Sequence, residues 1–277
     1  MIERVIKKIN WIKYKNNLRF QKVCKRLAFW LAKISKVDLF EDAAAKKNFV
    51  EIIKYVEGRR TKKKLEIDGQ NFEYLFHSYN NLGLTERSVE IPIIQFYLNN
   101  LKPKDVLEIG NVTNYYQSYY ENSFPNKTVV DKIEFCYNVI TSDIAKYFSD
   151  KKFDFIFSIS TFEHMDSDLD RNPDYKKGSA KSLSIAADNI IHCYENLLAT
   201  NGTLLITAPM GYTPEWDLTF KNDWLLRYGF NNVTRHLYKR ISIEEWIKLD
   251  SVNLNDEMKY DEPFPYANYV AVIEIKK

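Results

Sequence analysis

Two adjacent residues near the middle of the chain, Glu163 and His164, are of types that can move a proton during a reaction. They come soon after the apolar run Phe153–Ser158. A neutral imidazole can take a proton from a hydroxyl group, and a neighbouring carboxylate can orient that imidazole or contact a cofactor. The structural alternative is that His164 caps a turn or packs against its neighbours. Both readings stay open, and we take Glu163 and His164 as the candidate catalytic residues after a predicted buried strand.

Acids and small polar residues follow other apolar runs of the chain in the same way. An acid at the end of a buried strand is costly unless it has a positive or hydrogen-bonding partner. Such residues suit a ligand with ribose hydroxyls, an amino group and an adenine ring. The alternative for the aspartates is a role in forming turns. The set of candidate ligand-binding residues comprises Glu108, Gly110, Asp131, Asp143, Ile144, Ser160 and Thr161.

These residues must be positioned by strands whose carboxyl ends meet at one edge of a sheet. Apolar runs separated by crossovers predict a buried parallel sheet with helices on both faces, a doubly wound α/β fold. Residues Ser182–Leu198 predict an amphipathic helix closed by Asn201-Gly202. The predicted strands are Val106–Ile109, Thr128–Asp131, Asn138–Thr141, Phe153–Ser158, Thr203–Ala208 and Tyr269–Ile275.

The residues before this sheet predict a separate, mainly helical region. Residues 1–56 lack Gly and Pro and carry apolar residues at helical spacing. Leu65–Tyr74 alternates around Asp68-Gly69 and predicts a hairpin, and Thr85 is the expected N-cap of a helix that runs toward Asn100. We expect a basic amphipathic arm (1–36), a helical cap or lid (37–100) and a catalytic domain (101–277) with an aromatic insertion at 211–240.

Five segments in order give the chain a resemblance to the class I S-adenosylmethionine (SAM)-dependent methyltransferases. The resemblance implies a Rossmann-like, mostly parallel sheet with its last strand antiparallel, SAM as cofactor, and roles in cofactor binding for the candidate residues above. Its first motif commonly reads E-x-G-x-G-x-G, whereas this chain has Val112 and Asn114 at the later glycine positions. The segments are VLEIG (106–110), VVD (129–131), SDI (142–144), FDFIFSISTFEHM (153–165) and LLATNGTLLITAPMG (197–211).

The altered turn EIGNV still retains the acid and the first glycine of that motif. Asn tolerates positive φ better than most residues, so we expect Asn111 and Asn114 to close the turn and to line the amino-acid end of SAM. EIGNV and the stretch TERSVEIP (85–92) are similar to a subgroup often linked to bacterial surface-polysaccharide biosynthesis. That subgroup implies O-methylation of a sugar hydroxyl.

Aromatic and basic residues supply candidates for contacts with a small-molecule or lipid-linked sugar. Tyr116, Tyr212, Trp216 and Arg87 form this set, with packing as the alternative for the aromatic members. A second hypothesis is a catalytically inactive methyltransferase-like scaffold or binding protein at a membrane surface. A nicotinamide-dependent enzyme is disfavoured because no G-x-G-x-x-G follows any predicted strand.

The charge is distributed unevenly along the chain. Residues 1–36 hold eleven Lys/Arg and one acid, whereas the remaining 241 residues hold 29 basic and 36 acidic side chains. Aromatic residues alternate with the basic ones in the arm, which favours an anionic membrane surface as partner over nucleic acid, for which no motif is present. The cysteine spacing and the lack of a long apolar run favour a cytoplasmic protein, and the arm suggests a peripheral position at the inner face of the membrane.

The acids within 165–174 are expected to form a loop and not a metal site.

Overall fold

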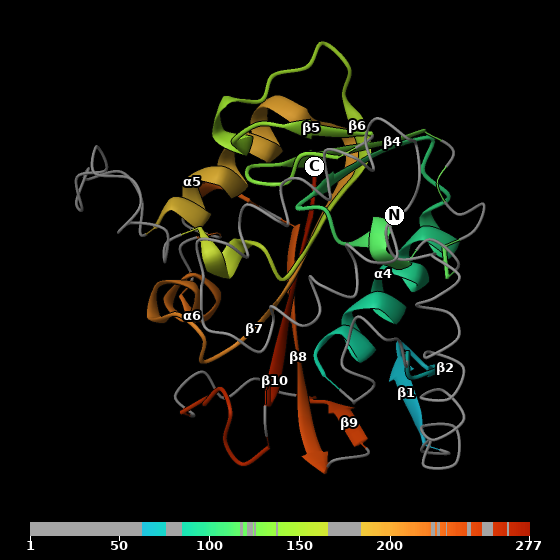
Figure 1. Ribbon diagram of the computed structural model, residues 1–277, viewed down its shortest axis with the longest axis vertical. Helices are drawn as coiled ribbons and strands as arrows, with labels where there is room; N and C mark the ends of the chain where they lie inside the picture. Colours follow the sequence, from blue (N-terminus) through green and yellow to red (C-terminus); the bar gives the residue numbers. More distant parts are fainter. Residues whose placement is uncertain are drawn as a thin grey trace, which may run out of the picture.

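The structure is a computed structural model of the 277-residue chain, and Figure 1 shows its arrangement. It describes residues 63–75, 85–116, 119–120, 124, 126–136, 138–165, 184–222, 225, 228–230, 232–242, 245–250, 257–264 and 266–277. The predicted basic arm, the helical stretch 1–56 and the acids at 166–174 lie outside the described residues. In the described part of the chain, no helix is long and apolar enough to cross a membrane.

Eight strands of the described residues form one mixed sheet in the order β5-β4-β3-β6-β7-β10-β8-β9. The first five run parallel, and β10 lies antiparallel between β7 and β8. The antiparallel last strand confirms the predicted sheet. The strands are β3 Asp105–Ile109, β4 Asn126–Asp131, β5 Val139–Thr141, β6 Phe153–Ile159, β7 Leu198–Pro209, β8 Asn232–Ser242, β9 Glu245–Lys248 and β10 Tyr269–Lys276.

All six predicted strands are present, and β8 and β9 are additional. The sequence of β8, NVTRHLYKRIS, carries charged residues and lacks a continuous apolar run, because the strand lies toward an edge of the sheet and is only partly buried. β9 is a short edge strand that pairs only with β8 among the described strands. Strand β8 begins inside the expected insertion at 211–240, and the domain boundaries themselves stay a prediction.

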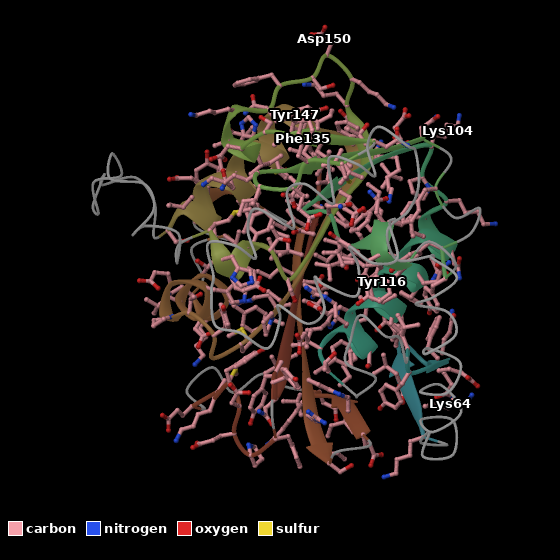
Figure 2. All side chains as sticks on the ribbon, in the orientation of Figure 1. Lys64, Lys104, Tyr116, Phe135, Tyr147 and Asp150 are labelled. Carbon is pink, nitrogen blue, oxygen red and sulfur yellow. The ribbon has the colours of Figure 1, made fainter. Side chains whose placement is uncertain are left out.

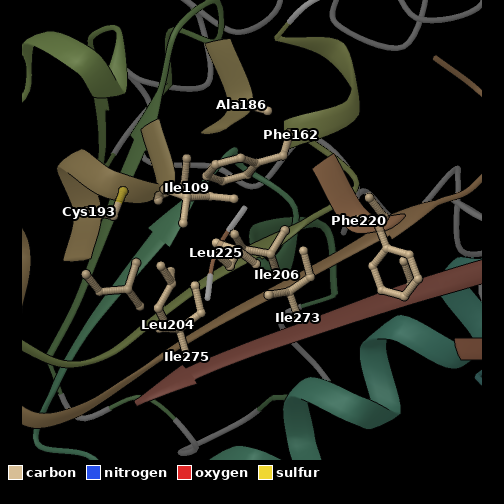
Figure 3. Close-up of a cluster of buried hydrophobic side chains, with 14 of the residues drawn as sticks. Ile109, Phe162, Ala186, Cys193, Leu204, Ile206, Phe220, Leu225, Ile273 and Ile275 are labelled. Carbon is tan, nitrogen blue, oxygen red and sulfur yellow. The ribbon is translucent and has the colours of Figure 1, made fainter. Parts of the chain in front are cut away.

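Two hydrophobic clusters lie on opposite faces of this sheet. One cluster joins helix α4 (Arg87–Leu101) to β3 and β6 through residues such as Ile91 and Phe155. The other joins α5 (Ile185–His192) and α6 (Pro214–Lys221) to the sheet, and Figure 3 shows Ile206 and Ile273 within it. Figure 1 shows α4 on one side of the long strands and α5 and α6 on the other. The layered α/β prediction is therefore confirmed.

The helix that precedes β7 lacks the C-terminal cap that the sequence predicted. Helix α5 continues as a π-helical turn, Cys193–Leu197, and β7 starts at Leu198. Asn201 and Gly202 lie within β7 and do not cap the helix. The Nζ of Lys277 donates instead to the carbonyls of Tyr194 and Leu198, so a side chain from the end of β10 satisfies the terminal carbonyl groups.

The start of helix α4 also differs from the prediction. The helix begins at Arg87, two residues after Thr85, and Glu86 occupies the N-cap position with helical backbone angles. The Oγ1 of Thr85 is buried without a hydrogen-bond partner, so Thr85 is not a side-chain cap. Its carbonyl accepts from the N–H of Ser88. The extra turn formed by Thr85 and Glu86 moves the helix start past the predicted cap.

The predicted hairpin is confirmed as β1 (Lys64–Ile67) and β2 (Gln70–Glu73). Asp68 and Gly69 form its turn with φ of 47° and 78°, the positive values that a two-residue hairpin turn requires. The hairpin is fixed to β9 because the hydroxyl of Tyr74 donates to the carbonyl of Trp246 and accepts from its N–H. The ion pair of Lys248 with Asp68 adds a second contact.

Candidate functional site

The turn after β3 meets the segment after β6 at the carboxyl edge of the sheet. Gly110 has a φ of 85°, and a Cβ placed on it would lie 2.1 Å from the Oγ1 of Thr161. The N–H of Gly110 donates to the carbonyl of Val130 on β4. Strands β3 and β6 are neighbours whose connections leave in opposite directions, which makes this contact the switch point of the sheet, where ligands of such folds bind.

The carboxylate of Glu108 accepts hydrogen bonds from backbone N–H groups of the turn after β3. Its side chain is fully buried, and its Oε1 accepts from the N–H groups of Val112 and Thr113 at 2.9 and 2.6 Å. Its Oε2 accepts from the hydroxyl of Thr113 and forms an ion pair with Lys127 at 3.2 Å. Four donors occupy a carboxylate that has about four acceptor sites. The structure therefore gives Glu108 a role in the turn, while contact with a cofactor stays a prediction.

Asn111 and Asn114 close the turn by a different route from the one predicted. Neither residue has a positive φ. The side chains bond to each other instead, from Asn114 Nδ2 to Asn111 Oδ1 at 2.6 Å, and Lys127 donates to Asn114 Oδ1. Asn111 Nδ2 also donates to Glu134, which accepts from the hydroxyl of Tyr115 as well. The expectation of left-handed asparagines was wrong because side-chain hydrogen bonds shape this turn.

The two aspartates lie at the ends of β4 and β5, beyond the altered turn. Asp131 Oδ2 accepts from the N–H of Asn111, and its Oδ1 accepts from the N–H groups of Ile133 and Glu134. Asp143 caps a 3₁₀ turn through Ala145 N and pairs with Lys132 at 3.4 Å. Both aspartates are partly exposed. They form turns and stay partly exposed at this edge, while contact of either with a cofactor stays a prediction.

Ile144, the remaining candidate at this end, is buried. It packs in the hydrophobic cluster of the α5 face, beside Ile109 and Val130. The Ile144 side chain therefore belongs to the hydrophobic core that packs next to Asp143. A direct contact of Ile144 with an adenine ring stays a prediction.

Glu90 joins helix α4 to the ends of β6 and β7. Its side chain is fully buried and accepts from the hydroxyl of Ser160 at 2.8 Å and from that of Thr207 at 3.0 Å. It also forms an ion pair with Arg87. Ser160 has a φ of 39°, a left-handed value that is unfavourable for a residue with a side chain. The hydrogen bond to Glu90 thus fixes the segment that leads to Glu163.

Glu163 and His164 follow that segment in a 3₁₀ turn, Phe162–His164. The side chain of Glu163 is 1% exposed and that of His164 is 51% exposed, with 3.6 Å between Glu163 Oε1 and His164 Nε2. Burial raises the pKa of Glu163 well above its usual range, and nearby Glu90 raises it further. His164 also contacts the ring of Tyr212, with centroids 4.9 Å apart. The structure thus places the predicted pair after β6, with His164 accessible and Glu163 buried beside it.

Tyr260, from a distant part of the chain, packs against Tyr212 next to His164. Its ring lies 5.2 Å from that of Tyr212. Burial raises its pKa, and the charges of Glu86 and Glu163 act in the same direction. Sequence reasoning missed Tyr260, which follows no strand and belongs to no motif. It also missed Glu86 and Glu90, although both belong to the TERSVEIP stretch.

Two of the predicted substrate-contacting residues are buried. Trp216 is 0% exposed and packs 6.5 Å from the ring of Phe162, and its Nε1 has no hydrogen-bond partner. Tyr116 is also 0% exposed and belongs to the cluster beneath α4; Figure 2 shows it beside that helix. Neither ring offers a face for stacking on a sugar, because helix packing encloses both. Tyr212, at 43% exposed, retains an open ring.

A second depression lies away from the carboxyl edge, between the hairpin and β8–β9. It has a volume of about 640 Å³ and a mixed-charge lining that includes Asp68, His236 and Lys248. Burial and the charge of Lys248 lower the pKa of His236. The described residues contain no group of three or more His, Cys, Asp or Glu that could hold a metal ion.

Comparison with known proteins gives likenesses among solved structures. No protein-family profile and no curated protein sequence matches this chain. A SAM-dependent methyltransferase from Archaeoglobus fulgidus has a TM-score of 0.42 and 16% identity, covering 70% of this chain and 95% of that one. The N-methyltransferase NodS from Bradyrhizobium japonicum WM9, with S-adenosyl-L-homocysteine (SAH), has a TM-score of 0.40 and 13% identity, covering 71% and 90%.

A further SAM-dependent methyltransferase, from Clostridium acetobutylicum ATCC 824, has a TM-score of 0.35 and 13% identity, covering 68% of this chain and 89% of that one. No functional conclusion follows from likeness at this level. The strand order, with five parallel strands followed by the reversed β10, is the decisive observation. The fold is Rossmann-like, with a mostly parallel sheet and the antiparallel strand β10. This confirms the fold expected from the sequence.

Proposed function

We propose that the protein is a SAM-dependent methyltransferase. The observation that carries this proposal is the convergence of the predicted segments at the switch point. The Gly110 turn meets Thr161 there, and the partly exposed Asp131 and Asp143 end the next two strands. This edge is where doubly wound sheets bind nucleotides, and the sheet has the reversed last strand that the resemblance implies.

The residues at this edge fit a nucleoside cofactor. Within the part of the chain that the structure describes, Asp131 Oδ2 accepts from a single N–H, so it retains capacity for a ribose hydroxyl. Asp143 is the residue we expect beside the adenine. When bound, the cofactor supplies an electrophilic methyl group. The half-exposed His164 can remove a proton from the acceptor, with Glu163 beside it.

We further propose that the acceptor is a hydroxyl of a sugar or of a sugar-containing, nucleotide- or lipid-linked intermediate of surface-polysaccharide biosynthesis. Two features support this. The TERSVEIP stretch, which carries the resemblance to that subgroup, contributes Arg87 and Glu90 to the site. The open ring of Tyr212 beside His164 can pack against a sugar face. Binding of the arm to the inner membrane leaflet would suit a lipid-linked acceptor.

Calorimetric titration of the full chain with SAM and with SAH tests the cofactor assignment. We expect saturable binding of both ligands. Lack of binding at millimolar ligand would overturn the proposal.

Transfer of labelled methyl groups from SAM to a panel of nucleotide sugars then tests the acceptor. In that assay His164→Ala should lower the rate about 10²- to 10⁴-fold while SAM affinity is retained.

A second candidate is an inactive methyltransferase-like scaffold or binding protein. The observation that favours it is the saturation of Glu108 by donors of its own chain, together with the mutual bonding of Asn111 and Asn114. Asn111 and Asn114 are the residues expected at the amino-acid end of SAM, and Glu108 is a candidate for cofactor binding. This candidate requires that neither SAM nor SAH binds, which the same titration measures.

A further inference from the structure

The cavity between the hairpin β1–β2 and strands β8 and β9 is separate from the carboxyl edge described above. Its volume of about 640 Å³ lies in the range of small-molecule sites. Strand β8 is separated from β6 by β7 and β10, so three inter-strand steps of ~4.8 Å place it about 14 Å from the strand that precedes Glu163. Figure 1 shows the hairpin next to β9, away from β3 and β4.

The lining of this cavity is almost entirely charged or polar. Leu249 is its one apolar member among the described residues. Three carboxylates face two cations, so the lining has a net negative charge when its histidine is neutral. Such a lining excludes an apolar ligand and suits one that forms hydrogen bonds. The charged and polar members are Glu66, Asp68, Asp250, Arg235, His236 and Lys248.

Both cations of the lining are engaged by groups of the chain itself. Arg235 Nη1 donates to the carbonyls of Phe220 and Asn222, at the end of α6, at 2.9 and 3.2 Å. Lys248 forms an ion pair with Asp68 across the cavity, from β9 to the turn of the hairpin. Neither cation is therefore held in readiness for an anionic ligand.

Two carboxylates and an imidazole of the lining remain available. Within the part of the chain that the structure describes, Glu66, Asp250 and His236 form no hydrogen bond or ion pair. Burial and the charge of Lys248 lower the pKa of His236, so its ring is neutral at pH 7 and offers one donor and one acceptor. The available groups thus accept more hydrogen bonds than they donate.

A ligand that complements this cavity carries a positive charge and several hydrogen-bond donors. An ammonium group offers three charge-assisted N–H donors to carboxylates, and neighbouring hydroxyls can bond to the imidazole and to the remaining carboxylate oxygens. We propose that the cavity binds a small hydroxylated amine, with the chemistry of an amino sugar, through Glu66, Asp250 and His236. This site does not depend on the proposed function, whose residues lie at the carboxyl edge.

Proton NMR titration of the full chain at pH 7 with three sugars tests the charge of the ligand separately from its hydroxyls. Glucosamine carries an ammonium group, glucose carries hydroxyls alone, and glucuronic acid carries a carboxylate. The chain has four histidines, and His236→Gln identifies the imidazole resonance of His236. We expect glucosamine to shift that resonance saturably and to bind about tenfold more tightly than the other two sugars.

Single charge removals test the two carboxylates. Glu66→Gln and Asp250→Asn should each weaken glucosamine about threefold. Asp150→Asn is the control with the same change in net charge, because this exposed residue lies in the loop before β6, away from the cavity (Figure 2). Its affinity for glucosamine should equal that of the wild type.

A change of opposite sign is expected at the ion pair. Lys248→Gln removes a cation and releases Asp68, so it should tighten glucosamine binding, and the hydrogen bonds between Tyr74 and Trp246 keep the hairpin in place. Unchanged or weaker binding in Lys248→Gln would overturn the inference. So would the lack of a saturable shift, equal or tighter binding of glucose or glucuronate, or losses no larger than in the control.

SAH affinity, measured by calorimetry on the same variants, separates this inference from the proposed function. It should be unchanged in every variant, because the cavity and the carboxyl edge are separate. Failure to bind glucosamine with SAH binding retained would remove only the cavity site. Failure of the wild type to bind SAH, with glucosamine binding retained, would remove only the proposed function.

Discussion

At the scale of single residues, the contact between Gly110 and Thr161 makes the first prediction. Gly110→Ala places a methyl group 2.1 Å from Thr161 Oγ1 at a φ of 85°. Gly69→Ala is the matched control, since Gly69 has a φ of 78° with no atom within 4 Å of the added Cβ. We expect about 1 kcal/mol of destabilisation at Gly69 and clearly more at Gly110, measured by urea unfolding.

The double variant Gly110→Ala, Thr161→Gly separates steric contact from backbone strain. Removing the Thr161 side chain eliminates the atoms that the new methyl group meets, whereas the positive φ of residue 110 persists. The added cost of Gly110→Ala in this background should fall to the value measured at Gly69. An unchanged cost would show that Thr161 is not what restricts this position.

The buried carboxyl of Glu163 predicts a pH dependence of stability. Its pKa is raised by burial and by Glu90, so its protonated form favours folding below the ordinary carboxyl pKa. That stability is lost as pH rises through the higher folded-state pKa. Glu163→Gln, which cannot ionise, should therefore become more stable relative to wild type as pH increases from 5 to about 8.

At the scale of elements, the buried Glu90 connects helix α4 to the carboxyl ends of β6 and β7 through hydrogen bonds. Glu90→Ala leaves Arg87 partly buried without its ion-pair partner and removes the acceptor for Ser160 and Thr207. We expect a loss of about 3 kcal/mol in the free energy of unfolding. Thr207→Val removes one hydrogen bond of the same network and should cost only about 1 kcal/mol. Similar losses for the two variants would contradict a central role for Glu90.

The same elements show how far the sequence predicts this molecule. Continuous apolar runs are sufficient to predict β3, β4, β5, β6, β7 and β10, because strands that are covered on both faces of the sheet need apolar residues on both faces. Strand β8 was missed because it lies beside the edge strand β9 and is only partly buried, so it tolerates charged residues. The capping of the helix before β7 by Lys277 depends on a contact 79 residues apart in sequence with Leu198. Local sequence patterns carry no signal for such a contact.

In the candidate site, too, positions at strand ends were predictable from sequence, whereas contacts between distant residues were not. The residues at strand ends were predicted because strand position fixes them, and the structure places Gly110, Asp131, Asp143 and Thr161 at one edge. Whether a carboxylate there is free or saturated depends on distant donors, as Lys127 shows for Glu108. The burial of Trp216 depends likewise on how α6 packs. Tertiary contacts therefore decide which residues remain available to a ligand.

At the scale of the whole molecule, the uneven charge predicts where the protein binds in the cell. Residues 1–36 carry eleven basic residues and one acid, whereas the rest of the chain carries an excess of acids. Each Lys or Arg near an anionic lipid surface contributes about 1 kcal/mol, and salt screens this attraction. The full chain should therefore bind vesicles containing phosphatidylserine, bind neutral phosphatidylcholine vesicles weakly, and dissociate as salt is raised.

Charge removal in the full chain tests whether the arm is responsible for this binding. Replacing four lysines of the arm with glutamine should lower the affinity for anionic vesicles at least about tenfold, measured by co-sedimentation at about 0.1 M salt. Four exposed lysines of the body, replaced in the same way, provide a control with identical net charge. Equal losses in the two variants would assign the binding to overall charge and not to the arm, which would remove the reason to expect an acceptor at the membrane. The arm set is Lys7, Lys8, Lys13 and Lys15, and the body set is Lys102, Lys104, Lys146 and Lys151.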